Sequence, residues 1–231
     1  MLSGFRAVDL TQPIRHDTVR WPGEPAPSAR LLATLADDGA YAREITIGEH
    51  TGTHLDAPCH FVEWAESVDQ IGVERLFRPL AVIDIGDEIG GNADAELTLE
   101  QVEAFELRHG RIPQGAAVFL RTGWEAFYED PVRYANEGGD LRFPGYGPEA
   151  ARFLVEARDV AGLGIDTLGI DPGRSGDHPI HREITLPKGR WHVENLCNLR
   201  GLPPLGAWVV VAPLRLTGGS GCPCRVIALV P

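Results

Sequence analysis

Three histidines and one aspartate fall within the eleven residues from His50 to His60. Neutral imidazole and carboxylate groups together form the ligand set that Zn²⁺ and similar divalent ions prefer. The spacing of His50 and His54 suits a helix, but Gly52 and two β-branched threonines lie between them and disfavour one. We therefore expect an extended segment that turns into a loop. On a strand, the four residues His50, His54, Asp56 and His60 would share one face.

This shared face predicts a metal site. Gly52 has the same parity and adds no side chain, so it leaves room for an ion. The alternative is a polar loop whose histidines form only local hydrogen bonds. Four potential ligands of one parity in so short a span favour the metal site, with Zn²⁺ expected and Mn²⁺ as the second choice.

The pattern His-x-Gly-Thr-His-x-Asp-x-Pro-x-His-Phe, residues 50–61, resembles the signature of the metal-dependent cyclase-like hydrolases. That family includes bacterial kynurenine formamidase and isatin hydrolase, and the resemblance covers nearly the whole chain. It implies an α/β fold related to swivelling β/β/α domains. It also implies a homodimer or homotetramer in which neighbouring subunits help to close the active site.

The same resemblance implies a second set of ligands from the far half of the chain. His181 and Glu194 match the family positions, and Asp56 would bridge two ions if both are bound. The segment between His181 and Glu194 contains a Pro-Lys-Gly turn in place of a clean helix. His178 and His192 therefore remain alternatives to His181, and His192 shares the parity of Glu194 on an extended strand.

The chemistry implied is metal-assisted hydrolysis of an amide. A bound ion lowers the pKa of its water from about 15.7 to roughly 7, which makes hydroxide available to attack a carbonyl carbon. His60 has no assigned ion and is the predicted general base and later general acid. The alternative is that His60 only orients Asp56. Trp21 and Trp64 are predicted to contact an aromatic substrate, although Trp21 could equally pack its own loop and Trp64 could fill the core.

Three functions remain open on this evidence. Arylformamidase, which releases formate from N-formylkynurenine in tryptophan catabolism, is the first, and ring opening of isatin uses the same attack on an aryl amide. A metal-binding module without catalysis is the third. A pure binding site would more often be closed by four protein ligands, which disfavours this last function.

The composition is that of a globular protein, with 231 residues of which 43% are hydrophobic and 23% charged. A net charge of -12 without a basic run argues against nucleic acid and anionic membrane surfaces as partners. The start of the sequence has no signal-peptide core, and no apolar run approaches membrane-spanning length. We expect a cytoplasmic protein with reduced thiols. The Cys222-Pro-Cys224 pair has no second thiol pair near it, so we interpret these cysteines as structural or incidental.

Strands and helices mix without strict alternation, which predicts one domain over residues 1–231 with a mixed β-sheet and flanking helices. The clearest helix follows Thr98, whose capping box with Gln101 marks its start, and Gly110 marks its end. A second helix is predicted over 148–158, and residues 125–147 form a long polar loop. Strands are predicted over 7–10, 42–47, 80–85, 116–121, 160–165, 207–212 and 225–230. Asp166 and Asp171, which follow one of these strands, are expected to cap loops.

Overall fold

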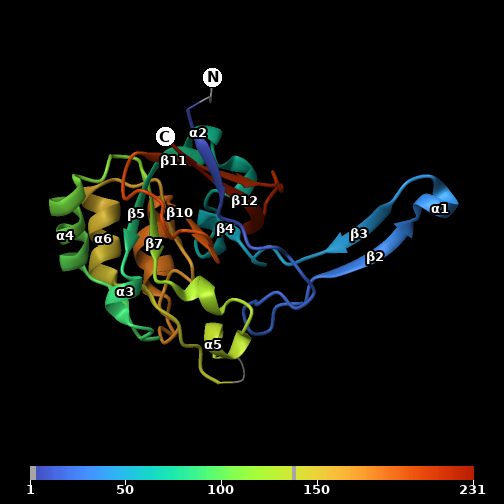
Figure 1. The fold of residues 1–231 in the computed structure, drawn as a ribbon, viewed down its shortest axis with the longest axis horizontal. Coiled ribbons are helices and arrows are strands. Elements are labelled where there is room, and N and C mark those ends of the chain that lie inside the picture. Colours follow the sequence, from blue (N-terminus) through green and yellow to red (C-terminus); the bar gives the residue numbers. More distant parts are fainter. Residues whose placement is uncertain (1–3, 137–138) are drawn as a thin grey trace.

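The computed structural model describes residues 4–136 and 139–231 and contains one mixed sheet that closes on itself. Its strands are β1 (Arg6–Asp9), β4 (His54–Asp56), β5 (Phe77–Asp84), β7 (Ala117–Arg121), β9 (Gly162–Ile165), β10 (Trp191–Glu194), β11 (Ala207–Pro213) and β12 (Gly221–Val230). The order is β1-β12-β11-β5-β7-β9-β10-β4, and β12 also pairs with β4. The strands from β12 to β4 therefore form a barrel, and β1 extends it outside β12 (Figure 1).

Period-two alternation divides the apolar side chains of the barrel between two cores. On β5, Leu80 and Val82 face the barrel interior, whereas Ala81 and Ile83 face outward. The outward face packs against α4 (Leu99–His109) and α6 (Pro148–Ala157), which lie side by side in Figure 1. The predicted mixed sheet with flanking helices is confirmed, and barrel closure is an addition to it.

Local signals placed most of the regular elements correctly. The Thr98 side chain accepts a hydrogen bond from the Gln101 amide and Gln101 bonds back, so the predicted capping box is present at the start of α4. Each predicted strand overlaps a strand of the structure. The predicted loop over 125–147 contains part of η3 (Trp124–Phe127), together with α5 (Pro131–Ala135) and β8 (Gly145–Tyr146). Residues 137–138 of that loop lie outside the described part of the chain.

The predicted strand over 42–47 lies apart from the barrel. Among the described strands, β3 (Ala42–Thr46) pairs with β2 (Ser28–Ala33) alone, and α1 (Leu35–Asp38) lies between them in the chain. The resulting hairpin projects away from the barrel as an arm (Figure 1). The other short elements are η1 (Pro58–His60), η2 (Val68–Gln70), α2 (Val73–Leu76), α3 (Gly86–Ile89) and β6 (Glu96–Leu97). Within the described residues, no helix combines the length and apolar character needed to cross a membrane.

The segment before β10 differs from its prediction. Ile180–Thr185 forms a π-helix, η4, and Leu186–Lys188 continues it as a short 3₁₀ helix, η5, where the sequence indicated only a turn. Pro187 and Gly189 do end the helical segment, and Gly189 takes the left-handed conformation with φ of 70°. The wide π-turn accommodates an extra residue in a helix, and such turns occur often at functional sites.

Candidate metal centre

Two neighbouring strands present four potential metal ligands on one face of the barrel wall. β4 and β10 are antiparallel, with His192 opposite Asp56 and Glu194 opposite His54. Leu55 lies between His54 and Asp56 on β4, and Val193 lies between His192 and Glu194 on β10. Both apolar side chains pack in the barrel interior, so the four polar side chains point to the outer face. All four are buried. The strand register therefore brings two widely separated parts of the sequence into one cluster.

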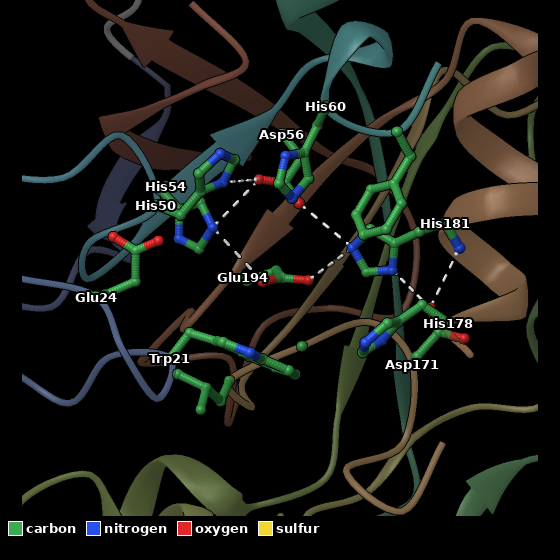
Figure 2. A pocket seen from close by; sticks show the side chains of 13 residues that line it. Trp21, Glu24, His50, His54, Asp56, His60, Asp171, His178, His181 and Glu194 are labelled. Carbon is green, nitrogen blue, oxygen red and sulfur yellow. Dashed lines mark hydrogen bonds and ion pairs between the residues drawn. The ribbon is translucent and has the colours of Figure 1, made fainter. Parts of the chain in front are cut away.

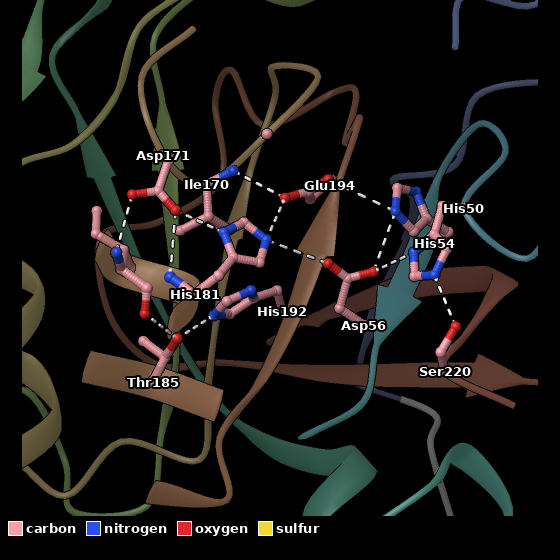
Figure 3. Close-up of polar contacts among 12 residues, drawn as sticks. His50, His54, Asp56, Ile170, Asp171, His181, Thr185, His192, Glu194 and Ser220 are labelled. Carbon is pink, nitrogen blue, oxygen red and sulfur yellow. Dashed lines mark hydrogen bonds and ion pairs between the residues drawn. The ribbon is translucent and has the colours of Figure 1, made fainter. Parts of the chain in front are cut away.

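The fifth side chain, His181, projects from η4 over this face (Figures 2 and 3). Its Nε2 lies 3.4 Å from Asp56 Oδ2 and 3.4 Å from Glu194 Oε1. On the other side, His54 Nε2 lies 3.2 Å from Asp56 Oδ1 and 3.5 Å from Glu194 Oε2. Each carboxylate thus spans the two histidines, with one oxygen toward each.

These separations suit divalent ions. Two ligand atoms at roughly 2.0–2.2 Å from one ion, in tetrahedral arrangement, are about 3.4 Å apart. The donor set of neutral nitrogens and carboxylate oxygens is the one that zinc and related ions take. Among the described residues that line the cavity beside this cluster, none is lysine or arginine. Buried carboxylates need a compensating cation, so the cluster fits one ion or two.

The pKa shifts of the cluster also indicate a site for positive charge. Burial alone would lower the pKa of His54, but Asp56 and Glu194 raise it to about 9. Burial likewise opposes protonation of His181, yet hydrogen bonds to Asp171, Asp56 and Glu194 raise its pKa well above the usual value. Burial would raise the pKa of Asp56, but the neighbouring histidines hold it well below its usual range. The carboxylates therefore favour positive charge at this position, as protons or as a metal ion.

His50 and His60 lie near the cluster but are not on the strand that was predicted to carry them. Only His54–Asp56 is strand, because Gly52 turns the chain with φ of 64° and His60 lies in η1. The parity argument therefore holds for His54 and Asp56 alone. His50 Nδ1 still lies 2.6 Å from Asp56 Oδ1, and the His60 ring stacks on His50 with centroids 4.0 Å apart. Burial lowers the pKa of His60 to about 4, so its ring is neutral near pH 7.

Two hydrogen bonds fix which nitrogens face the cluster. His54 Nδ1 donates to the Gly52 carbonyl at 2.9 Å, so its Nε2 is left to bind an ion. The contact of His181 Nδ1 with Asp171 Oδ2 at 2.6 Å does the same for His181. Asp171 also accepts hydrogen bonds from two backbone amides of η4, so it caps a helical turn where we expected it to cap a loop. Its contact with His181 adds an orienting role. The Asn195 side chain donates to the Gly52 carbonyl at 3.0 Å, a contact that no sequence signal indicated.

A cavity of about 200 Å³ opens beside the cluster (Figure 2). Trp21 lines it and meets the His178 ring edge-on at 5.5 Å between centroids. The structure does not bring Trp64 there. Its side chain is 93% exposed, because the chain turns after η1 and Trp64 takes φ of 63°. Phe61 lines the cavity instead, with its ring centroid 5.0 Å from that of His181.

Of the alternative ligands, His178 lines the cavity, and within the described part of the chain it groups with Asp171 and His181 but not with Asp56 or Glu194. His192 does group with Asp56, His181 and Glu194. The four cysteines are free, and none belongs to a potential metal group of the described residues. Cys222 and Cys224 are buried on β12 in the barrel interior, in agreement with a structural role.

Comparison with known proteins agrees with this geometry. The cyclase family model, described as "Putative cyclase", matches residues 8–172. An isatin hydrolase of Roseibium aggregatum is 34% identical over 196 residues, which cover 81% of this chain and 74% of that protein. A kynurenine formamidase of Bacillus anthracis is 26% identical over 226 residues and 95% of each chain. The solved structure of isatin hydrolase A from Ralstonia solanacearum has a TM-score of 0.92 and 36% identity, covering 99% of this chain and 93% of that one.

The chain therefore belongs to the cyclase family. It is a hydrolase of that family, with a cluster of histidine, aspartate and glutamate side chains suited to a metal ion. The predicted homodimer or homotetramer, the cytoplasmic location and the identity of the ion remain predictions.

Proposed function

We propose that the protein hydrolyses a cyclic aryl amide of the isatin type, with divalent ions held by His50, His54, Asp56, His181 and Glu194. Zn²⁺ is the expected ion and Mn²⁺ the second choice. The observation that carries the proposal is the pair of carboxylates spanning His54 and His181 at 3.2–3.5 Å, next to a neutral His60.

The comparisons favour isatin-type ring opening over formamide hydrolysis. The isatin hydrolase of Roseibium aggregatum is 34% identical to this chain, against 26% for the kynurenine formamidase of Bacillus anthracis. Arylformamidase, our first expectation from the sequence, becomes the second candidate. It is kept because the kynurenine formamidase aligns over 95% of both chains.

The cavity also supports a compact, neutral substrate. Its volume of about 200 Å³ lies below the roughly 300–1,000 Å³ of pockets that bind drug-sized ligands. N-formylkynurenine carries an α-carboxylate, which would need a cationic partner. The described lining residues include no lysine or arginine to supply one, whereas isatin carries no charge. Trp21 and Phe61 offer apolar faces to a flat bicyclic ring.

The roles of the side chains follow from their positions. When bound, a divalent ion supplies Lewis acidity that polarises the amide carbonyl and eases deprotonation of water. His60 is neutral and accepts the proton of the attacking water as the new C–O bond forms. His60 then gives that proton to the amide nitrogen of the substrate as the amide C–N bond breaks. The product carries an aryl amine and a carboxylate. Asp171 and the Gly52 carbonyl keep His181 and His54 in their ligand tautomers.

The test is hydrolysis of isatin and of N-formylkynurenine by the purified protein, stripped with a chelator and reloaded with Zn²⁺ or Mn²⁺. We expect isatin to be the better substrate by kcat/KM, and activity to depend on added metal. His109→Ala is a matched histidine control, because His109 is exposed at the end of α4. Greater activity on N-formylkynurenine would select the second candidate. Metal binding without hydrolysis of either amide would contradict the proposed function.

A further inference from the structure

His192 is fully buried, and its hydrogen bond fixes the position of its proton. The Thr185 hydroxyl donates to the Ile180 carbonyl at 2.7 Å, which uses its single hydrogen. In the 2.6 Å contact between His192 Nε2 and Thr185 Oγ1, the hydroxyl oxygen must therefore accept and Nε2 must donate. A neutral imidazole carries one N–H and one bare nitrogen, and here the N–H is at Nε2. Its Nδ1 consequently carries a free lone pair.

That lone pair has no partner among the described residues. His192 Nδ1 is buried and takes part in no hydrogen bond there. A buried polar atom left unsatisfied costs about 1–3 kcal/mol, so a fold rarely keeps one without a reason. Such an atom is suited to accept a hydrogen bond or to bind a cation.

The surroundings of the ring select a cation. His192 lies directly opposite Asp56 in the β4–β10 ladder and shares the outer face with Glu194. One ligand atom from each of Asp56, His181, His192 and Glu194 lies within 4.8 Å of the others. Figure 3 shows the His192 ring between Thr185 and the Asp56 carboxylate. The His181 ring stands perpendicular to it at 4.5 Å between centroids.

We propose that His192 binds through Nδ1 as a further ligand of the ion that Asp56, His181 and Glu194 hold. His192 is not among the residues that line the cavity, so it approaches this ion from the barrel wall. The inference rests on the proposed function only in requiring a divalent ion at the cluster. Thr185 fixes the tautomer of His192 as Asp171 fixes that of His181.

The test measures metal binding directly, without substrate, by titrating the stripped protein with Co²⁺ against a chromophoric chelator. Loss of a group that merely orients a ligand weakens binding by about 10–100-fold. We therefore expect His192→Ala to lower the affinity for one equivalent of Co²⁺ by more than 100-fold. The substitution should also change the visible absorption of bound Co²⁺. His109→Ala should change neither. A smaller loss of affinity, or an unchanged Co²⁺ spectrum, would overturn direct ligation by His192.

A second variant guards against misfolding, because His192 lies in the core. His192→Asn keeps an oxygen acceptor close to the place of Nδ1. The Co²⁺ affinity of His192→Asn should be at least tenfold higher than that of His192→Ala. The far-UV circular dichroism spectra of the parent and both variants, stripped of metal, should be the same. Failure of His192→Asn to recover affinity while folded would also overturn the proposal. Because the readout is affinity, a parent that binds Co²⁺ without hydrolysing any amide would refute the proposed function and leave this inference standing.

Discussion

Replacement of His60 by alanine separates catalysis from metal binding. The His60 ring stacks on His50, a contact worth about 0.5–1.5 kcal/mol beyond the area buried. Loss of that contact alone would change a rate or an affinity by roughly tenfold at most. A positioned general base contributes about 10²–10⁴-fold, so a loss of proton transfer exceeds the packing effect. We expect His60→Ala to keep its metal and fold but to lose at least about 100-fold in turnover.

The assay is single-turnover hydrolysis of isatin at saturating metal, with metal content measured on the same samples and His109→Ala as the control. Burial lowers the pKa of His60 to about 4, so the neutral ring is available as a base above that pH. Added imidazole should restore part of the activity of His60→Ala, because it can occupy the vacated space. A variant with full metal and a rate within tenfold of the parent would show that His60 only supports His50. Loss of metal would make His60 a ligand.

Three further changes probe the supports of the site and of the fold. His54→Ala should lose bound metal relative to the parent by elemental analysis, and unchanged stoichiometry would remove His54 from the ligand set. Asp171→Ala should weaken metal binding by about 10–100-fold in a chelator competition, since His181 loses the partner of its Nδ1; unaltered affinity would contradict that role. Asp166→Asn tests a buried carboxyl that accepts hydrogen bonds from Thr122 and whose pKa burial raises to about 6. The raised pKa favours folding below about pH 4, and this contribution of about 3 kcal/mol is lost as pH rises through 6. The stability deficit of Asp166→Asn should therefore shrink by about that amount between pH 4 and 7 in urea unfolding, and a constant deficit would refute the assignment.

The elements that sequence predicted well are those with local signals. α4 begins at a capping box, and α6 has Pro148 in its first turn, so both helices could be located within a residue or two. Closure of the barrel had no such signal, because β12 pairs with β4 across more than 160 residues. The projecting arm was also hidden, since β3 alternates like a strand of the main sheet and only its partner β2 places it outside.

The candidate site divides in the same way. The residue types of the motif predicted a metal site, and the structure gathers His54 and Asp56 into a cluster that could hold an ion. The parity that we assigned to His50 and His60 failed where Gly52 turns the chain. Asp171 was expected to cap a loop, and its second contact with His181 depends on a π-turn that the Pro-Lys-Gly segment concealed. Trp64 was expected near the cavity because it lies close to His60 in sequence. Trp64 itself has a positive φ, and its side chain points into solvent instead.

Register between two short strands is what converts these local patterns into one cluster. Sequence establishes that His54 and Asp56 share a face, and that His192 and Glu194 share a face. It does not establish that the two faces coincide. That follows from the pairing of His192 with Asp56, and a slip of one residue would turn one pair into the barrel interior. The apolar residues between them, Leu55 and Val193, are fully buried in that interior and prevent the slip. The packing of the barrel core therefore sets the geometry of the metal ligands on its outer face.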